Sequence, residues 1–522
     1  MGSLITGFHS VSRCNAAERF EVHFEEMSIP ISIKELNDWA INQDENNSEL
    51  ASWLSLLGFE SRESLSKFLQ TSFVKDKEII LQLVQSWFGR KMFEEIIDIV
   101  RLDNKSSGDE IYKYLEEFLQ SKNRNTLLDF IGNLPAEVIH IDLDGMVKVA
   151  NIWRIELKRQ QKLVSDLGSL SIKEQKNSKE EILKGRIKAP IVEVMSLSVD
   201  HRIDPLPIEI WKSSKGANPR ESLIVLMPGF GGDSAHFRWL ARSLSLNGWS
   251  VLALQHPGSD SKAVKSLLEG KLPAPGLEVI PDRLGDLRAV LNSREKGIIQ
   301  VPGEKIVLIG HSLGAFTAFL SLGTEPNINL EDLCSKAFDD FSLTNLSELL
   351  QCQLVDFTLP MQEEIPDLNA IVGINSFGSL LWSRNSIEKI SVPVLLTGGT
   401  FDLVTPAISE QLGLFLATKP NPLSRVLLIE GASHFSPIRV KGKTNKKIGD
   451  DVFKLNQSFV GVNPLSVQDL LAKEIISFLS NFENNRRQSL GMNLVENDIR
   501  YHMLDRTSVK KLLKINNESL DQ

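Results

Sequence analysis

Residues 305–320 read Lys305-Ile-Val-Leu-Ile-Gly-His-Ser-Leu-Gly-Ala-Phe-Thr-Ala-Phe-Leu320, an aliphatic run followed by a helical run of small and apolar residues. Between the two runs lies a G-x-S-x-G sequence centred on Ser312. This setting predicts a tight strand-to-helix turn with a strained backbone at Ser312. Glycine fits positions 310 and 314, because side chains there would collide with the neighbouring strand and helix. The segment is therefore a candidate nucleophile elbow.

A serine hydroxyl is a weak nucleophile at neutral pH and needs a histidine base and an acid that orients the base. Both occur downstream, in the order Ser, Asp, His. Asp402 follows the apolar run Val392-Pro-Val-Leu-Leu-Thr397, and His434 follows Arg425-Val-Leu-Leu-Ile429. Catalytic groups in open α/β sheets collect at the carboxyl ends of strands. We therefore predict a triad of Ser312, Asp402 and His434.

Other interpretations of these residues are open. Asp402 could be a turn-forming aspartate and His434 a loop histidine without a role. Among competing acids, Asp367 precedes its strand and Glu430 ends one, so neither position fits the orienting role as well. Histidines that precede the acid in the chain are interpreted as packing or loop residues: His236, His256 and His311.

A tetrahedral intermediate needs backbone N–H donors for its oxyanion. One is expected from Leu313, the residue after the nucleophile. The other is expected from Phe230 in the loop Met227-Pro-Gly-Phe-Gly-Gly-Asp233, whose glycines allow backbone amides to face a substrate. The alternative is an ordinary glycine turn.

A cap is predicted over residues 323–366, between the elbow helix and the next strand. Two apolar stripes at helical spacing predict two helices, from Leu330 to Phe341 and from Leu346 to Phe357. Their apolar faces would shape an acyl or alkyl pocket, with candidate lining residues Phe338, Phe341 and Leu350. The alternative is that these stripes only pack on the domain.

Over residues 190–482 short apolar runs alternate with helical patterns, which predicts an α/β domain with a mostly parallel sheet. Strands are expected at 191–197, 208–211, 223–227, 250–254, 306–309, 370–374, 392–397 and 426–429. Helices are expected at 236–246, 283–292, 314–322 and 467–482. Residues 483–522 are predicted to be a polar C-terminal tail.

The preceding part of the chain has a different pattern of apolar residues. Residues 18–155 predict a mostly helical accessory domain, with strands at 20–33 and 138–142. In this domain His23 and His140 are expected to be structural, and the sequence shows no run of metal ligands. A helix and polar linker follow over residues 156–189. Residues 1–17 end like a cleavage region without an apolar core, so either there is no export signal or the numbering begins inside one.

The chain of 522 residues has 42% hydrophobic and 24% charged residues, which is ordinary for a globular protein. Its net charge of -9 and the lack of a basic stripe argue against a nucleic-acid partner. No apolar run approaches the length of a transmembrane helix. Cys14, Cys334 and Cys352 form no metal-ligand pattern; Cys334 and Cys352 could form a disulfide or remain two buried thiols.

Taken together, the Met227–Asp233 loop, the elbow, Asp402 with Thr405-Pro406, and Ser433-His-Phe-Ser436 resemble a known family. They are similar to cyanobacterial-type α/β hydrolases that carry an N-terminal domain of unknown function. These are relatives of platelet-activating-factor acetylhydrolases and dienelactone hydrolases. Acetylhydrolase relatives tend to place the acid where this chain has Asn375, and an asparagine cannot supply the negative charge; Asp402 is therefore preferred.

The resemblance implies an α/β-hydrolase fold and a serine esterase or lipase activity on small-molecule or lipid esters, without metal or organic cofactor. It also implies export to a periplasm or thylakoid lumen, which would suit a Cys334–Cys352 bridge; a chain without a signal would stay in the cytoplasm. A thioesterase or peptidase with the same triad is an alternative. So is a non-catalytic protein of this fold that binds partners through residues 18–155. The oligomeric state does not follow from the sequence.

Overall fold

The computed structural model describes residues 17–42, 48–55, 59–70, 90, 99–102, 108–120, 126–134, 136–169, 189–268, 277–324, 329–339, 345–356, 364–382, 387, 390–438 and 462–518. They form two units, and the division falls between Asn151 and Ile152, within the helix α8 (Leu143–Ser169).

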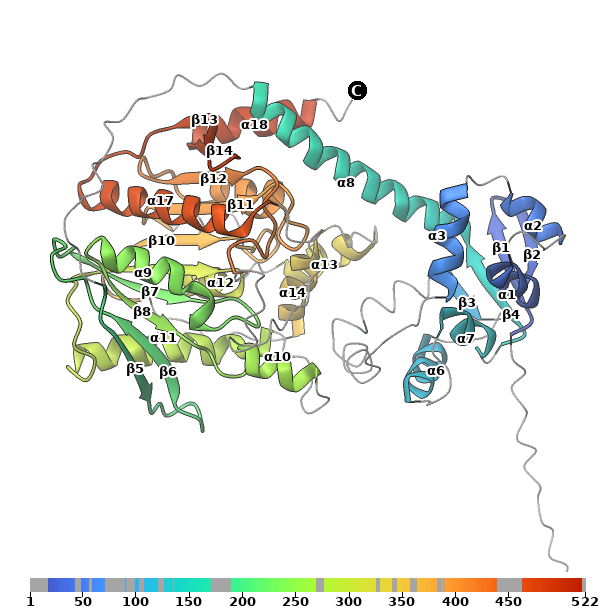
Figure 1. The fold of residues 1–522 in the computed structure, drawn as a ribbon, viewed down its shortest axis with the longest axis horizontal. Coiled ribbons are helices and arrows are strands. Elements are labelled where there is room, and N and C mark those ends of the chain that lie inside the picture. Colours follow the sequence, from blue (N-terminus) through green and yellow to red (C-terminus); the bar gives the residue numbers. More distant parts are fainter. Residues whose placement is uncertain are drawn as a thin grey trace, which may run out of the picture. The chain divides into compact units, whose positions relative to one another are not determined.

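The first unit is a small mixed domain built on a four-stranded sheet (Figure 1). Its strands are β1 (Arg19–Phe24), β2 (Met27–Ser32), β3 (Val100–Leu102) and β4 (Val138–Asp142), in the order β2-β1-β4-β3. Strand β1 runs parallel to β4 and antiparallel to β2. The helices are α1 (Ile33–Ile41), α2 (Glu49–Leu54), α3 (Phe59–Gln70), α6 (Gly108–Gln120) and α7 (Leu127–Gly132). The sequence predicts the helices and three strands, but β3 lies in a stretch predicted to be helical.

One face of this sheet carries the core of the first unit. Phe20, Leu102 and Ile139 are buried there, each on a different strand. Period-two alternation places the polar residues of β1 and β4 on the opposite face.

The second unit is organised by a ten-stranded sheet of order β13-β14-β12-β11-β10-β9-β7-β8-β6-β5 (Figure 1). Its strands are β5 (Val192–Leu197), β6 (Leu206–Trp211), β7 (Ser222–Met227), β8 (Ser250–Leu254), β9 (Lys305–His311), β10 (Leu368–Ile374), β11 (Val394–Gly399), β12 (Arg425–Ile429), β13 (Gly491–Glu496) and β14 (Ile499–Leu504). Strands β8, β7, β9, β10, β11 and β12 are parallel neighbours. All eight strands expected between residues 190 and 482 are present.

Helices cover the central strands on both faces, which explains why those strands are almost continuously apolar. On one face, α9 (Arg238–Leu246) and α17 (Pro464–Glu483) lie side by side over residues such as Ile224, Val307 and Val372 (Figure 1). The helix after the elbow, α12 (Leu313–Leu320), is buried along its whole length. Further helices are η2 (Ser234–Phe237), α10 (Ser261–Leu268), η3 (Leu277–Val279), α11 (Ile280–Glu295), η5 (Ala407–Gly413) and α16 (Leu414–Ala417).

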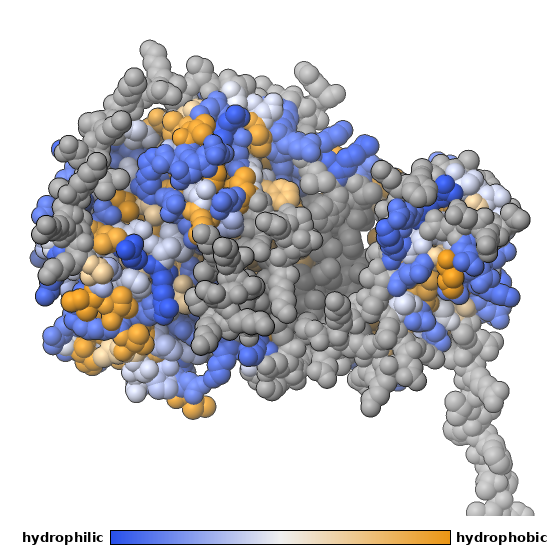
Figure 2. All heavy atoms as spheres, viewed as in Figure 1, coloured by the Kyte–Doolittle hydropathy of each residue, from blue (hydrophilic) through white to orange (hydrophobic). Residues whose placement is uncertain are grey.

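The surface of the second unit has mixed polarity. Figure 2 shows hydrophobic side chains scattered among hydrophilic ones on the visible face. Some exposed apolar residues lie on the edge strand β5, at Val192 and Val194. None of the described helices combines the length and apolarity needed to cross a bilayer.

The C-terminal segment corrects the sequence-based expectation of a polar tail over residues 483–522. Strands β13 and β14 form a hairpin, and β14 pairs antiparallel with β12, so the segment extends the large sheet. The helix α18 (Arg506–Glu518) follows. Asn497 and Asp498 form the turn with φ of 48° and 64°, a conformation that short polar side chains tolerate. Because polar residues such as Asn493, Glu496 and Arg500 interrupt these strands, the segment resembles a solvated tail in the sequence.

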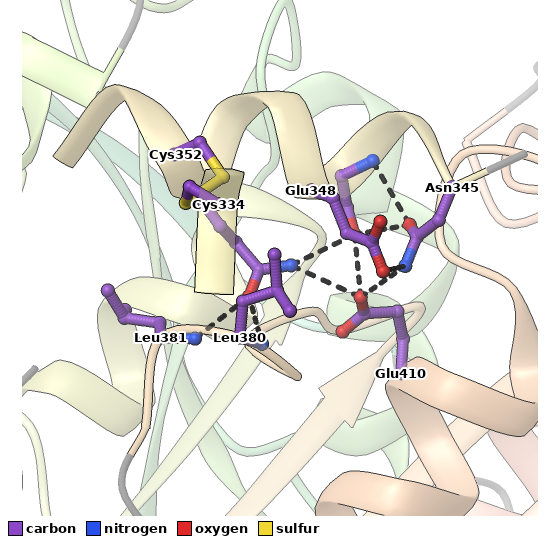
Figure 3. The surroundings of a disulfide bond; sticks show 9 residues. Cys334, Asn345, Glu348, Cys352, Leu380, Leu381 and Glu410 are labelled. Carbon is purple, nitrogen blue, oxygen red and sulfur yellow. Dashed lines mark hydrogen bonds between the residues drawn. A yellow bond between two sulfur atoms is a disulfide. The ribbon is translucent and has the colours of Figure 1, made fainter. Parts of the chain in front are cut away.

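The predicted cap contains α13 (Leu330–Asp339), α14 (Leu346–Cys352) and η4 (Gln353–Asp356). A disulfide joins Cys334 of α13 to Cys352 at the end of α14 (Figure 3). Of the two states that the sequence left open for these cysteines, the structure therefore has the bonded one.

A buried carboxylate attaches α14 to the sheet domain. Glu410 of η5 accepts hydrogen bonds from Asn345 Nδ2 at 2.8 Å, Ser347 Oγ at 2.8 Å and Gln351 Nε2 at 3.1 Å (Figure 3). It also accepts from the amides of Gly378 and Ser379 and from the Ser379 hydroxyl, which follow β10. Because a buried carboxylate is stable only when its oxygens are satisfied, these donors hold cap and domain together.

This attachment makes cap stability depend on pH through Glu348. Burial, together with the charge of Glu410, raises the pKa of Glu348 to about 7. The folded state therefore retains a proton that the unfolded chain, with a pKa near 4.5, has lost. The stability from this group is present in full below the unfolded pKa and is lost as the pH rises through the folded one.

We predict that Glu348→Gln removes this loss, because the amide cannot ionise. The melting temperature of the wild type should fall relative to that of the variant between about pH 5 and about pH 8. Glu331→Gln, on the exposed side of α13, is the matched control. Its melting temperature should change with pH as that of the wild type does. If the melting temperatures of the wild type and of Glu348→Gln change with pH in the same way across this range, the prediction is wrong.

Candidate active site

Ser312 lies at the sharp junction of β9 and α12 with φ of 51°, a left-handed conformation that costs free energy in a non-glycine residue. A Cβ at Gly310 would overlap the backbone of Gly314, and one at Gly314 would overlap the carbonyl oxygen of Met227 on β7. The predicted steric reason for both glycines is thus confirmed. The turn is so tight that it leaves the serine at the carboxyl end of the sheet.

The structure brings the three predicted triad residues together in a hydrogen-bonded chain. Ser312 Oγ lies 3.0 Å from His434 Nε2, and His434 Nδ1 lies 3.0 Å from Asp402 Oδ2. All three side chains are buried, Asp402 with only 1% of its surface exposed. His434 and Asp402 come from loops after β12 and β11, at the same end of the sheet as Ser312.

Asp402 is held by donors on both carboxylate oxygens. Oδ1 accepts from the amides of Val404 at 2.9 Å and Thr405 at 2.8 Å, and Oδ2 accepts from Thr405 Oγ1 at 2.7 Å. Burial alone would raise the pKa of Asp402, but the nearby His434 and the Thr405 hydrogen bonds outweigh it and leave this pKa below its ordinary value. The acid is therefore ionised at neutral pH, as orientation of an imidazole requires.

Asn375 supplies a further donor to this acid. It directly follows β10 with φ of 48°, and its Nδ2 donates to Asp402 Oδ2 at 2.6 Å. This is the position at which the sequence comparison with acetylhydrolases placed a rival acid. Here the side chain at that position is an amide, and it supports the carboxylate of Asp402 in the loop after the next strand.

His311 packs against the histidine of the triad. Its Nε2 donates to the backbone carbonyl of His434 at 3.1 Å, and the two rings lie 5.0 Å apart between centroids. Burial, followed by repulsion from His434, lowers the pKa of His311 to about 3, so the ring is neutral at physiological pH. His311 thus fixes the His434 loop, in agreement with its predicted packing role.

The loop after β7 lies against Ser312. A Cβ at Gly229 would lie 3.0 Å from the Cβ of Ser312, so glycine allows this close approach. The next amide belongs to Phe230, while Leu313 begins α12 directly after Ser312. Within the described part of the chain, neither of these two amides donates to an acceptor. Their predicted role as oxyanion donors remains a prediction.

A fully buried arginine connects the elements around this loop. Arg283 of α11 donates to the carbonyl of Pro228, to Ser259 Oγ at 2.8 Å and to Thr317 Oγ1 at 3.2 Å. Burial lowers the pKa of Arg283 to about 9, which still leaves it charged at neutral pH. The guanidinium thereby joins the β7 loop, the β8 loop and α12.

Other residues that the sequence singled out lie elsewhere. Glu430 pairs with His502 at 2.8 Å, Asp367 precedes β10 on the surface, and His256 pairs with Asp286 at 2.8 Å. Leu350 is partly buried on α14. Phe341 and the side chain of Phe338 lie outside the described residues, so the predicted pocket lining remains a prediction.

The sequence did not indicate the supporting hydrogen bonds of three residues: Asn375, Thr405 and Arg283. Asn375 and Thr405 follow strands at the same sheet edge as Asp402, and this position in the sequence could have predicted that they lie near the acid. The contacts of Arg283 span from Pro228 to Thr317, and no local pattern indicates them.

We predict that Asn375→Ala slows the reaction of Ser312 with a fluorophosphonate probe about tenfold, because Asp402 loses a hydrogen bond from a buried donor. Asn369→Ala, which removes an amide near the other end of β10, should react like the wild type. The second-order labelling rate measures both. Equal rates for Asn375→Ala and the wild type would exclude a supporting role for this amide.

Comparisons with known proteins agree with this geometry. Residues 16–142 match the model of an alpha/beta hydrolase of unknown function, and residues 224–439 match that of the alpha/beta hydrolase family. No curated protein matches the chain. The second match includes Phe230, Ser312, Asp402 and His434. Fold, site geometry and family match together identify the ten-stranded unit as an α/β-hydrolase domain.

Proposed function

We propose that this chain is a serine-dependent hydrolase of carboxylic esters that works through an acyl-enzyme intermediate. The observation that carries the proposal is the continuous chain from Ser312 Oγ through His434 to an ionised Asp402, built on a strained elbow. A strained serine at hydrogen-bond distance from a base is the arrangement expected of an activated nucleophile. Hydrolase function follows from the domain type, whereas the ester substrate is our inference.

The first half-reaction begins when Ser312 Oγ attacks the carbonyl carbon of the ester. His434 Nε2 takes the hydroxyl proton as the new C–O bond forms. The carbonyl oxygen becomes an oxyanion, which accepts hydrogen bonds from the amides of Phe230 and Leu313. Collapse of the intermediate breaks the bond to the alcohol oxygen, which takes the proton from His434 and leaves.

The second half-reaction repeats these steps with water. His434 takes a proton from the water as it attacks the acyl-enzyme, and Ser312 Oγ leaves and recovers a proton from His434. Asp402 accepts a hydrogen bond from His434 Nδ1 throughout and stabilises the imidazolium that forms in each half. Asn375 and Thr405 keep its carboxylate in place.

The substrate class is inferred from the cap. The helices α13 and α14 carry apolar stripes; a disulfide joins the two helices, and the Glu410 hydrogen bonds fix α14 on the domain. A fixed apolar surface favours acyl chains over charged substrates. We therefore propose lipid-like or medium-chain acyl esters, in line with the esterase or lipase activity that the resemblance to acetylhydrolase relatives implies.

We predict that a fluorophosphonate probe labels the wild type and that Ser312→Ala abolishes labelling. Ser321→Ala, at the C-terminal end of the same helix, removes a buried serine without touching the triad and should retain it. Undiminished labelling of Ser312→Ala would refute the assignment of the nucleophile. Mass spectrometry of the labelled peptide identifies the modified residue.

We also predict turnover of p-nitrophenyl esters, with the highest kcat/KM for medium acyl chains in a series from acetyl to palmitoyl. Asp402→Asn should lower kcat by about 10⁴-fold, because the amide favours the wrong imidazole tautomer. Preference for acetyl esters would contradict the proposed apolar pocket. Preference for thioesters or peptides would identify those compounds, instead of carboxylic esters, as the substrates. Absence of turnover together with absence of labelling would favour a non-catalytic protein.

A further inference from the structure

A cluster of metal-binding side chains lies on the polar face of the sheet in the first unit. Among the described residues, Glu21, His23 and His140 form the one group of three His, Cys, Asp or Glu whose ligand atoms all lie within 4.8 Å of one another. Glu21 and His23 are on β1, and His140 is on β4, 117 residues after His23. The sequence shows no such cluster because the ligands come from distant segments.

The strand register creates this cluster. Strand β1 runs parallel to β4, with Glu21 directly opposite His140 and His23 opposite Asp142. Side chains at alternate positions of a strand share a face, so Glu21, His23 and His140 project to the same side. The core of Phe20 and Ile139 occupies the other side, and hydrophobic packing therefore does not account for two histidines here.

The donor atoms point toward one another. His23 Nε2 lies 2.8 Å from His140 Nδ1, and Glu21 Oε2 lies 3.5 Å from the same Nδ1. The ring centroids lie 5.1 Å apart and the ring planes differ by 23°, so the two rings meet end to end. At 2.8 Å one ring nitrogen donates a hydrogen bond to the lone pair of the other. A single N–H···N hydrogen bond thus spans the distance.

We propose that Glu21, His23 and His140 bind a divalent transition-metal ion, with Zn²⁺ as the model case. Two ligands of a tetrahedral zinc ion lie about 3.3 Å apart, given metal–ligand bonds of about 2.0 to 2.1 Å. The Glu21–His140 distance already fits. The two imidazoles must separate by about 0.5 Å and turn so that both lone pairs aim at the ion. The ring that donates moves its proton to its remote nitrogen, so both facing lone pairs bind the ion.

The surroundings suit a three-ligand site with an open fourth position. His140 and Glu21 have 18% and 26% of their side-chain surface exposed, so an ion and its water can reach them. Arg19 Nε and Nη2 lie 3.4 Å from Glu21 Oε1, which leaves Oε2 for the ion. The positive charge of Arg19 opposes the cation, whereas Asp142 beside His23 favours it. Two imidazoles and one carboxylate match ions of the zinc type better than Ca²⁺ or Mg²⁺.

The bound ion would connect β1 to β4 and thereby stabilise the first unit. It binds the folded sheet, because the two strands are brought together only by folding. This role is independent of the triad and of the proposed ester hydrolysis.

The test uses the full-length protein and Zn²⁺, with affinity measured by competition with a chromophoric chelator. Glu21→Gln, His23→Gln and His140→Gln should each weaken binding on the order of 100-fold, because each removes one ligand. Glu18→Gln removes an exposed carboxylate just before β1, and His201→Gln removes an imidazole from the other unit. Both controls should bind as the wild type does. Equal affinity of the three ligand variants and the wild type would overturn the proposal.

A second measurement needs no variant. Co²⁺ added to the wild type should give the intense visible absorption of a four- or five-coordinate ion with imidazole ligands, and Zn²⁺ should displace it. Zn²⁺ should also raise the melting temperature, and a chelator should reverse the rise. The weak spectrum of hexaaqua Co²⁺ would show that no site exists. A far-UV circular dichroism spectrum of the His140→Gln variant that matches the wild type would show that the variant is folded.

Discussion

The close approach of backbone at the elbow is the constraint on which the catalytic domain depends. Gly310 faces the first turn of α12, and Gly314 faces the carbonyl of Met227 at the end of β7. Because neither place has room for a Cβ, strand, helix and neighbouring strand can meet at the distance of backbone contact. Ser312 then adopts a left-handed conformation that the surrounding packing must offset. The β7 loop, which continues from Met227, is brought to the nucleophile by the same contact.

Around this point the domain uses buried polar groups to fix loops that hydrophobic packing alone would leave adjustable. Arg283 joins three elements beneath the β7 loop, and Asp402 accepts hydrogen bonds from two neighbouring loops. Each group would cost several kcal/mol if its partners were removed, because a buried charge would remain unpaired. Such groups therefore specify one arrangement of the loops, which suits a site that must hold hydrogen-bond geometry before the substrate arrives.

Much of this could be predicted from the sequence, because strands buried on both faces are apolar runs and the elbow has a local steric requirement. Ser312, Asp402 and His434 follow such strands, so their meeting at one sheet edge could be inferred. Other features depend on pairing between distant segments. Polar residues interrupt the strands of the β13–β14 hairpin, and Arg283 acts through contacts outside its own helix. The Glu21–His23–His140 cluster exists only once β1 lies beside β4. Single-sequence patterns carry no information about such register.

The attachment of α14 through Glu410 has a consequence for how molecules reach the serine. Three donors of the cap and three of the loop after β10 share this one carboxylate. Swinging α14 outward would leave a buried anion without half of its donors, so the helix does not serve as a hinged lid. Entry of substrate and exit of products must instead use side-chain motion or another segment around the site. Turnover in this domain would then not wait for α14 to open.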